Sequence, residues 1–218
     1  DYEEEIIEFQ KIYMEEMSKI RKTNMFTFPV STISLLYQNG EFVDKEFAEW
    51  AIKHNMIWSD SNLFVDDSVN SLSNCCRLKS DIRDLGYFNS VGGTALKVGS
   101  VKVNTINLAR LALDSENESD YLSKLADRVY LNLQALDCVR HIIERNVEKG
   151  LLPNFTNGLV DFEHLYNTIG FIGIFETMKK FGYTRKDEFD NTYYTKDAYR
   201  FGQAIFAQMR STMDKFIK

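Results

Sequence analysis

The stretch Gly99-Ser-Val-Lys-Val-Asn-Thr-Ile-Asn-Leu-Ala-Arg-Leu111 decides the fold class that this sequence predicts. Its first part alternates between polar and apolar side chains and its end becomes apolar, which is the pattern of a strand entering a buried sheet. A second strand is predicted over 25–36, although Pro29 removes a hydrogen-bond donor there. Together with the helical patterns around them, these segments predict a helix-rich chain with some strands.

Long helices are predicted wherever apolar residues recur every three or four positions. Gly150 and Pro153 end the longest of them, and Asn39-Gly40 marks a turn before a helix that Asp44 caps. The inner face of that helix contains Phe47, Trp50, Ala51 and His54. The predicted helices are the first one through Ile20, the one after Asp44, and those over 119–148, 161–181 and 195–217.

Two short segments, residues 167–170 and 155–160, are interpreted separately from the long helices. Residues 167–170 are interpreted as a break in the helix over 161–181, where free backbone N–H groups would face a phosphate. Residues 155–160 are interpreted as a short connection or strand.

The composition excludes several classes of function. The net charge is -6 and the acidic residues are spread along the 218-residue chain, which argues against nonspecific binding to nucleic acid. No apolar stretch approaches the ~20 residues that span a bilayer. Three cysteines, two of them adjacent, cannot form a secreted disulfide framework. We therefore expect a cytoplasmic protein without nucleic-acid or membrane partners.

Residues 59–103 are the least regular part of the sequence and contain the adjacent pair Cys75-Cys76. Long loops inside compact domains are usually functional, so a reactive thiol is one interpretation. Burial in a core is the other, because free cysteine is among the most buried residue types. No metal site is expected, since no Cys-x-x-Cys or nearby histidine completes one. The histidines are isolated and are interpreted as structural: His54, His141 and His164.

Four separated segments, taken in order, resemble the core of the anaerobic (class III) ribonucleoside-triphosphate reductases. They are Phe26-Thr-Phe-Pro-Val-Ser-Thr-Ile33, Ser73-Asn-Cys-Cys-Arg-Leu78, the stretch from Gly99 to Leu111, and Asn167-Thr-Ile-Gly-Phe-Ile-Gly-Ile-Phe-Glu176. The resemblance implies an α/β fold, a ten-stranded barrel made of two five-stranded halves with a central cysteine finger loop. It also implies that residues 1–218 are a single fragment of the catalytic barrel domain, with the finger loop at about 59–103.

The same resemblance assigns site residues. The cysteine-arginine pair of the family matches Cys76-Arg77, so Cys76 is expected to become the radical thiol, with Cys75 as the alternative catalytic residue. The expected substrate-binding residues are Asn74, Asn104, Asn107 and Thr168. Hydrogen bonds in turns and helix caps are an equally good role for such side chains.

The resemblance further implies a radical reduction of ribonucleotides. A thiyl radical at Cys76 would abstract the ribose 3′-hydrogen, the 2′-hydroxyl would leave as water, and the resulting deoxyribose radical would be reduced. Leu78 stands where aerobic relatives carry a glutamate base, so formate or a thioredoxin-like reductant would supply part of the chemistry. The glycyl radical of the family lies in a C-terminal segment and its zinc site uses cysteine pairs, and neither is found in this sequence.

The expected partners follow from that reaction. They are a ribonucleoside triphosphate substrate, a radical-SAM activating enzyme and the remainder of the reductase chain, with the full enzyme a homodimer. The first helix begins without an N-cap signal, which is expected of a chain cut from a longer one. Alone, the polypeptide is expected to be inactive, either as a fragment or as one part of a split enzyme.

Two other functions are compatible with the sequence. A glycyl radical enzyme of the pyruvate formate-lyase type also uses neighbouring cysteines on a finger loop, and it would be stabilised by a small keto acid instead of a nucleotide. A non-catalytic, helix-rich scaffold would have both thiols of Cys75 and Cys76 buried and inert.

Overall fold

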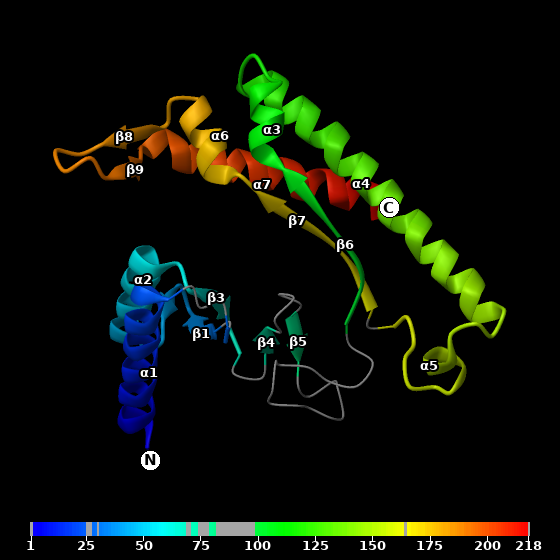
Figure 1. The fold of residues 1–218 in the computed structure, drawn as a ribbon, viewed down its shortest axis with the longest axis horizontal. Helices are drawn as coiled ribbons and strands as arrows, with labels where there is room; N and C mark the ends of the chain where they lie inside the picture. Colours follow the sequence, from blue (N-terminus) through cyan, green and yellow to red (C-terminus); the bar gives the residue numbers. More distant parts are fainter. Residues whose placement is uncertain are drawn as a thin grey trace. The chain divides into compact units, whose positions relative to one another are not determined.

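A computed structural model describes residues 2–24, 28–29, 31–68, 71–73, 79–81, 99–163 and 165–217 (Figure 1). The chain divides into two compact units, Asp1–Gly99 and Ser100–Lys218, and each has a hydrophobic core of its own. Among the helices in the described ranges, none is both long enough and apolar enough to cross a membrane. That both units belong to one barrel domain stays a prediction.

Unit 1 contains a small sheet and two helices. Its elements are α1 (Glu3–Thr23), β1 (Ser31–Gln38), β2 (Glu41–Phe42), α2 (Lys45–Trp58), β3 (Ser61–Asp66), β4 (Ser71–Ser73) and β5 (Lys79–Asp81). The sheet has the order β2-β1-β3. β1 and β3 are parallel, with Ser31 opposite Ser61 and Leu36 opposite Asp66, and β2 is antiparallel to β1 after the predicted turn at Asn39-Gly40. β4 and β5 form a separate antiparallel pair.

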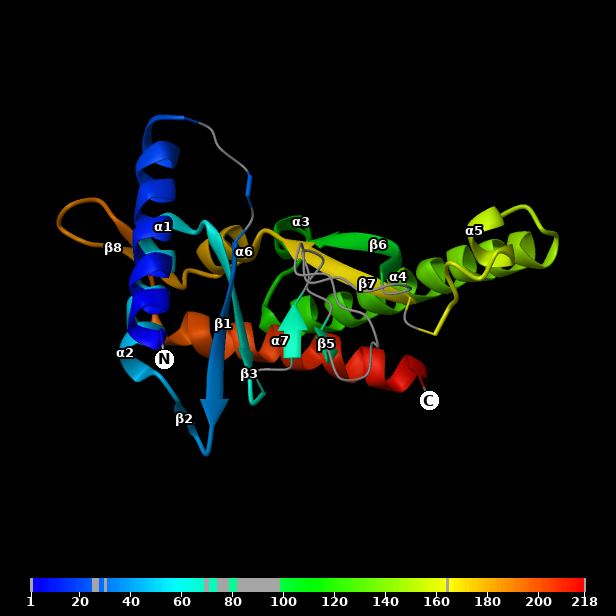
Figure 2. The same ribbon diagram turned by 90° about the horizontal axis from the view of Figure 1, so that it is seen from below.

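Helices α1 and α2 bury their apolar faces in the core of unit 1. The prediction that Asp44 caps α2 is confirmed, because its carboxylate accepts a hydrogen bond from the backbone N–H of Phe47 at 2.9 Å. β1 contributes the alternate residues Ile33 and Leu35 to the same core, as a strand with one buried face does. Figure 2 shows both helices on the same side of the β1–β3 pair.

Unit 2 contains a β-α-β arrangement followed by a hairpin and a long helix. Its elements are β6 (Gly99–Asn107), α3 (Leu108–Leu113), α4 (Glu118–Glu148), α5 (Pro153–Thr156), β7 (Leu165–Ile172), α6 (Ile174–Lys180), β8 (Thr184–Lys186), β9 (Thr192–Tyr194) and α7 (Lys196–Ile217). β6 and β7 are neighbours in one sheet, and Figure 1 shows both arrows pointing toward the end where α3 and α6 begin. The crossover between these two strands contains α4.

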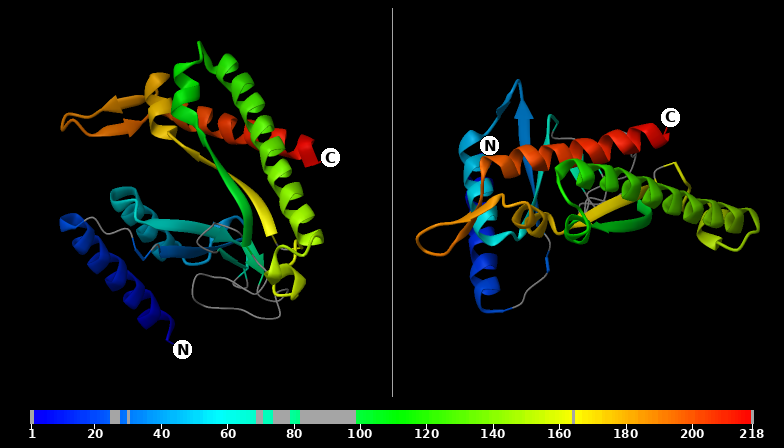
Figure 3. Two further views of the ribbon diagram at one scale, coloured as in Figure 1. Left: turned by 45° about the vertical axis from the view of Figure 1, so that its right-hand side comes forward. Right: turned by 90° about the horizontal axis from the view of Figure 1, so that it is seen from above.

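The core of unit 2 includes the contact between α4 and α7, which cross at an angle in both views of Figure 3. The rings of Tyr121, Phe181 and Phe201 meet there with centroids between 5.0 and 5.6 Å apart. Arg200 of α7 donates two hydrogen bonds, of 2.7 and 3.1 Å, to the Glu118 carboxylate at the start of α4. These bonds lower the pKa of Glu118 and tie the two helices together.

Most of the predicted helices are confirmed, but the one over 161–181 is wrong. Residues 165–172 form the strand β7, and only Ile174–Lys180 are helical. Residues 167–170 lie inside β7 and are not a helix break, so the predicted phosphate contact at such a break is also wrong. Residues 153–156 form the short helix α5. The hairpin of β8 and β9, with Thr184 opposite Tyr194, was not predicted.

Candidate functional site

The segment that contains the cysteine pair is flanked by two paired strands of unit 1. Ser71 lies opposite Asp81 and Ser73 opposite Lys79 in the antiparallel pair of β4 and β5. The residues between these strands are 74–78, so Cys76 is the middle one of the five. The described strands on either side of these residues are therefore paired with each other.

Three of the predicted site residues lie outside the residues that the structure describes. They are Asn74, Cys75 and Cys76. His164 lies outside them as well. The catalytic role of Cys76, the alternative role of Cys75 and the ribose contact of Asn74 consequently stay predictions.

The other predicted site residues belong to the adjacent strands β6 and β7 of unit 2. Asn107 is the last residue of β6 and the N-cap of α3, where its Oδ1 atom accepts a hydrogen bond from the backbone N–H of Arg110 at 2.9 Å. The side chain of Asn107 is exposed. Since the cap fixes the amide oxygen, the amide Nδ2 is the group of this side chain that can donate to a ligand.

The alternation of side chains places the predicted residues on different faces of this strand pair. Ile106 is buried in the core of unit 2, so Asn104, two residues earlier, is on the face that the helices cover. Thr105 and Asn107 are on the opposite face. A Cβ atom added to Gly170 would lie 3.2 Å from Thr105 Oγ1, which places Gly170 next to Thr105.

Thr168 belongs to the same face as Gly170, because the two residues are separated by one position in β7. Its Oγ1 atom is buried and has no hydrogen-bond partner among the residues that the structure describes. A buried hydroxyl without a partner is unfavourable by about 1–3 kcal/mol, so this oxygen is a candidate for contact with a ligand.

The chain turns from strand to helix at closely spaced points. Gly173, the N-cap of α6, has a φ of +83°, and a Cβ atom there would lie 2.8 Å from Ala109 Cβ and 2.9 Å from Ala109 N. Only glycine fits both the backbone conformation and the space. The backbone of Gly173, before α6, therefore packs directly against Ala109 at the beginning of α3. This contact restrains the beginning of α3, where Asn107 is the N-cap.

The arrangement offers hydrogen-bonding groups to a polar ligand on one face of β6 and β7. Active-site groups of α/β barrels gather at the C-terminal ends of parallel strands, and Asn107 lies at such an end. Thr105 shares this face and was missed by the sequence analysis, although the alternation with Ile106 would have indicated it. In the described part of the chain, no three His, Cys, Asp or Glu side chains gather as a metal site requires.

The family model of the anaerobic ribonucleoside-triphosphate reductases matches residues 1–218. Among curated proteins, none matches the chain. A solved anaerobic ribonucleotide reductase from Thermotoga maritima with citrate in the active site is 38% identical to it, with a TM-score of 0.59, and the match covers 99% of this chain and 38% of the other. The structure of the Thermotoga maritima enzyme in complex with dATP and CTP is 40% identical, with a TM-score of 0.60, and 35% of its length is covered.

The chain thus spans little more than a third of the length of these solved relatives. The likeness runs through both units, since 99% of the chain is aligned. It confirms the expected fold class, a helix-rich α/β segment of a reductase barrel of the glycyl radical enzyme type. The chain belongs to the anaerobic ribonucleoside-triphosphate reductase family.

Proposed function

We propose that this chain is the segment of an anaerobic ribonucleoside-triphosphate reductase in which Cys76 becomes the thiyl radical that activates the substrate. The observation that carries the proposal is the match of the family model over the full length of the chain, in which the strands on either side of residues 74–78, β4 and β5, pair with each other. A reactive thiol must be presented at a defined point, and Cys76 lies in the sequence between two strands that pair with each other.

The proposed chemistry begins and ends at the Cys76 sulfur. The thiyl radical takes the 3′-hydrogen atom of the ribose, which gives a thiol and a carbon radical. Loss of the protonated 2′-hydroxyl as water leaves a deoxyribose radical. A reductant of the formate or thioredoxin-like class then supplies two electrons, a proton adds at C2′, and the 3′-hydrogen returns from the thiol. Leu78 cannot act as a base, so the protons must move through other groups.

Substrate contacts are proposed for four polar side chains. Asn107 would donate its amide Nδ2–H to a substrate oxygen, and Thr168 would use its unpartnered hydroxyl in the same way. Asn74 would contact the ribose hydroxyls. Asn104 shares a face with the buried Ile106, so a contact from its side chain would be made from the face of β6 opposite to Asn107. The relative solved with dATP and CTP supports a nucleotide as the ligand class.

The remaining partners are proposed from the family. A glycyl radical on a segment that this sequence lacks would generate the thiyl radical, after activation by a radical-SAM enzyme. The zinc site would lie on that missing part too, and the complete enzyme would be a cytoplasmic homodimer. Because the chain spans about a third of its solved relatives, turnover by this chain alone is not expected.

The proposal is tested by anaerobic reconstitution with a segment that carries the glycyl radical and with the activating enzyme. We expect deoxynucleotide formation from a ribonucleoside triphosphate, and thermal stabilisation by the nucleotide but not by a small keto acid. Stabilisation by the keto acid alone would favour the pyruvate formate-lyase alternative. If the assembly forms no product, no ligand stabilises it, and both thiols are unreactive toward alkylation, the result would favour a non-catalytic scaffold.

Asn107→Asp separates helix capping from substrate binding. Aspartate retains the capping oxygen for Arg110 N–H but removes the amide donor, so we expect a free energy of unfolding within ~0.5 kcal/mol of wild type. If Nδ2 binds substrate, kcat/KM should fall by about 5- to 30-fold, the effect of losing about one to two kcal/mol of binding. Urea unfolding measures the first effect, and steady-state kinetics of the anaerobically assembled reductase measure the second.

Asn117→Asp is the matched control, because Asn117 caps α4 in the same way through a bond to Asp120 N–H of 3.0 Å. It should change neither quantity. Asn107→Ser keeps a capping oxygen without adding charge, and it should lose activity as the aspartate variant does. Wild-type kinetics in both Asn107 variants would contradict the proposed contact.

Thr168→Val replaces a buried hydroxyl by a methyl group of similar size. Since Oγ1 has no partner among the described residues, the variant should be as stable as wild type or more stable by up to about 1 kcal/mol. Nucleotide affinity, measured by calorimetry, should fall by about tenfold if the hydroxyl binds substrate. Unchanged affinity would remove Thr168 from the site.

A further inference from the structure

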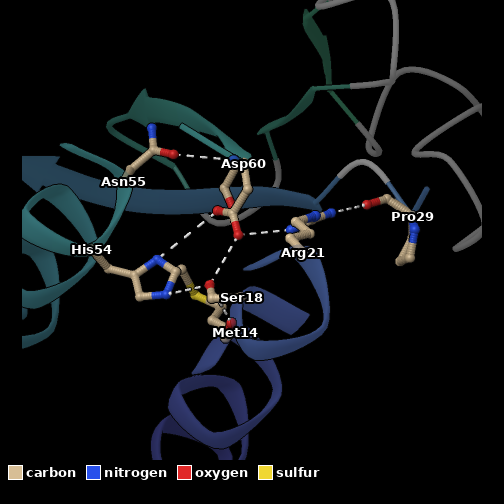
Figure 4. A network of polar contacts seen from close by, with 8 residues as sticks. Met14, Ser18, Arg21, Pro29, His54, Asn55 and Asp60 are labelled. Atoms are coloured by element: carbon tan, nitrogen blue, oxygen red, sulfur yellow. Dashed lines mark hydrogen bonds and ion pairs between the residues drawn. The ribbon is translucent and has the colours of Figure 1, made fainter. Parts of the chain in front are cut away.

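A buried polar network connects α1, α2 and the start of β3 in unit 1 (Figure 4). Ser18 Oγ lies 3.0 Å from His54 Nε2, 3.1 Å from Asp60 Oδ2 and 2.8 Å from the carbonyl oxygen of Met14. The side chains of His54 and Asp60 are only 7% and 4% exposed. Burying polar groups to this extent destabilises a fold unless hydrogen bonds replace their lost contacts with water. The contacts within the network must therefore compensate for this burial.

Arg21 extends the network to both strands of the parallel pair. Its Nη1 atom donates to Asp60 Oδ2 at 2.7 Å, and its Nη2 atom donates to the carbonyl oxygen of Pro29 at 2.8 Å. Asp60 directly precedes Ser61, the first residue of β3, and Pro29 is two residues before Ser31, the first residue of β1. Ser31 and Ser61 are partners in the register, so one guanidinium group holds the chain just ahead of both strands.

The hydrogen atoms of the network can be assigned from its geometry. Burial by itself would raise the pKa of Asp60, but hydrogen bonds from Ser61, Arg21 and Ser18 outweigh it and lower that pKa, so the carboxylate is ionised at neutral pH. Ser18 has a single hydroxyl proton, and Asp60 Oδ2 and the carbonyl oxygen of Met14 can only accept, so that proton is directed to one of these two oxygens. His54 is therefore the donor to Ser18, through Nε2–H.

A nucleophilic role does not fit this network. Ser18 is 2% exposed, and His54 Nδ1 lies 3.9 Å from Asp60 Oδ1, beyond hydrogen-bond distance. The ring of His54 is also held by the rings of Trp50 and Trp58, with centroids 5.2 and 6.5 Å away. The contacts orient these side chains rigidly, which suits a structural anchor.

We propose that Ser18, Arg21, His54 and Asp60 form a register clamp that fixes how β3 pairs with β1 and thereby positions the segment that leads through β4 to Cys76. A slip of one residue would turn every β3 side chain to the other face of the sheet. β4 ends at Ser73, directly before residues 74–78, so an error in β3 would be carried toward them. The clamp residues are positioning residues, and the part concerning Cys76 rests on the proposed function.

Hydrogen exchange in the assembled reductase tests the clamp itself. Arg21→Lys keeps the charge but cannot make two bonds in a fixed fork, and Asp60→Asn keeps the size but removes the charge. Both should lower the protection of β1 and β3 amides by at least ~10-fold while α4 and α7 amides keep theirs. Arg185→Lys is the control, since Arg185 also donates to two backbone carbonyls, those of Gly182 and Thr184, but is exposed.

Ser18→Ala is the mild variant if either of these substitutions prevents folding, and it should give a smaller loss of protection at the same amides. Wild-type protection of β1 and β3 in every foldable clamp variant would overturn the register clamp. So would an equal loss of protection in both units, because the effect would then not be local to the strands that Arg21 holds.

Kinetics test the link to Cys76. A displaced thiol should lower kcat about tenfold or more while the KM for the nucleotide stays within twofold, because the substrate contacts of unit 2 are intact. Loss of protection with an unchanged kcat would overturn the positioning role. If the wild-type assembly made no deoxynucleotide at all, the proposed function would fail while the exchange experiment still decided on the clamp.

Discussion

Replacing Cys76 with serine is expected to abolish deoxynucleotide formation by the anaerobically assembled reductase. An alkoxyl radical at this position cannot be formed by a glycyl radical, because the O–H bond is much stronger than the S–H bond. A loss of at least ~10⁴-fold, or more than about 5 kcal/mol in activation free energy, should follow. Product formation under strictly anaerobic conditions is the measurement, and the glycyl radical signal of the assembly should persist in the variant.

Cys75→Ser is the matched control, because the two cysteines are adjacent and the substitution is identical. We expect it to retain activity within about tenfold of wild type, the scale of a local packing change near a site. Loss with Cys75→Ser alone would move the radical to the neighbouring residue. Activity in both variants would be incompatible with the thiyl mechanism.

Gly173→Ala is expected to have the largest effect on stability in unit 2. The φ of +83° disfavours alanine by about 1 kcal/mol, and the new Cβ would lie 2.9 Å from the backbone nitrogen of Ala109, where overpacking costs a further 1–3 kcal/mol. The free energy of unfolding should therefore fall by about 2–4 kcal/mol. Urea denaturation followed by circular dichroism measures this change.

Gly158→Ala separates the two contributions. Gly158 has a similar φ of +71°, but nothing lies within 4 Å of a Cβ atom added there. This variant should lose only the ~1 kcal/mol of the backbone term. Equal losses in both variants would show that the close approach of Gly173 to Ala109 carries no energetic weight.

The sequence predicted the elements whose signals are local. The helices α1, α4 and α7 have long apolar stripes, and the cap of α2 has a residue type with a known role, Asp44, so both kinds of signal needed no knowledge of the rest of the fold. The strand β6 was predicted from its alternation.

The elements that the sequence did not reveal depend on distant partners. Residues 165–172 are mostly apolar without a clear period, a pattern shared by buried strands and helices, and only the neighbouring strand β6 makes them a strand. The parallel pairing of β1 with β3 is equally non-local.

The same distinction applies to the candidate site. Asn107 could be predicted as either a cap or a ligand-binding residue, and the structure shows the cap directly. The resemblance of short motifs identified Asn104 and Thr168, but it carries no information about which face of a strand a side chain occupies. That information came from Ile106 and Gly170, through burial and close approach.

The two tryptophan rings that neighbour His54 have a spectroscopic consequence. Trp50 and Trp58 are the two tryptophans of this chain, and both belong to α2 in unit 1, whereas the aromatic core of unit 2 consists of tyrosine and phenylalanine. Intrinsic tryptophan emission of the chain therefore reports unit 1 alone, while far-ultraviolet ellipticity is dominated by the long helices α4 and α7. Comparing the two signals during denaturation shows directly whether the units melt together or one after the other.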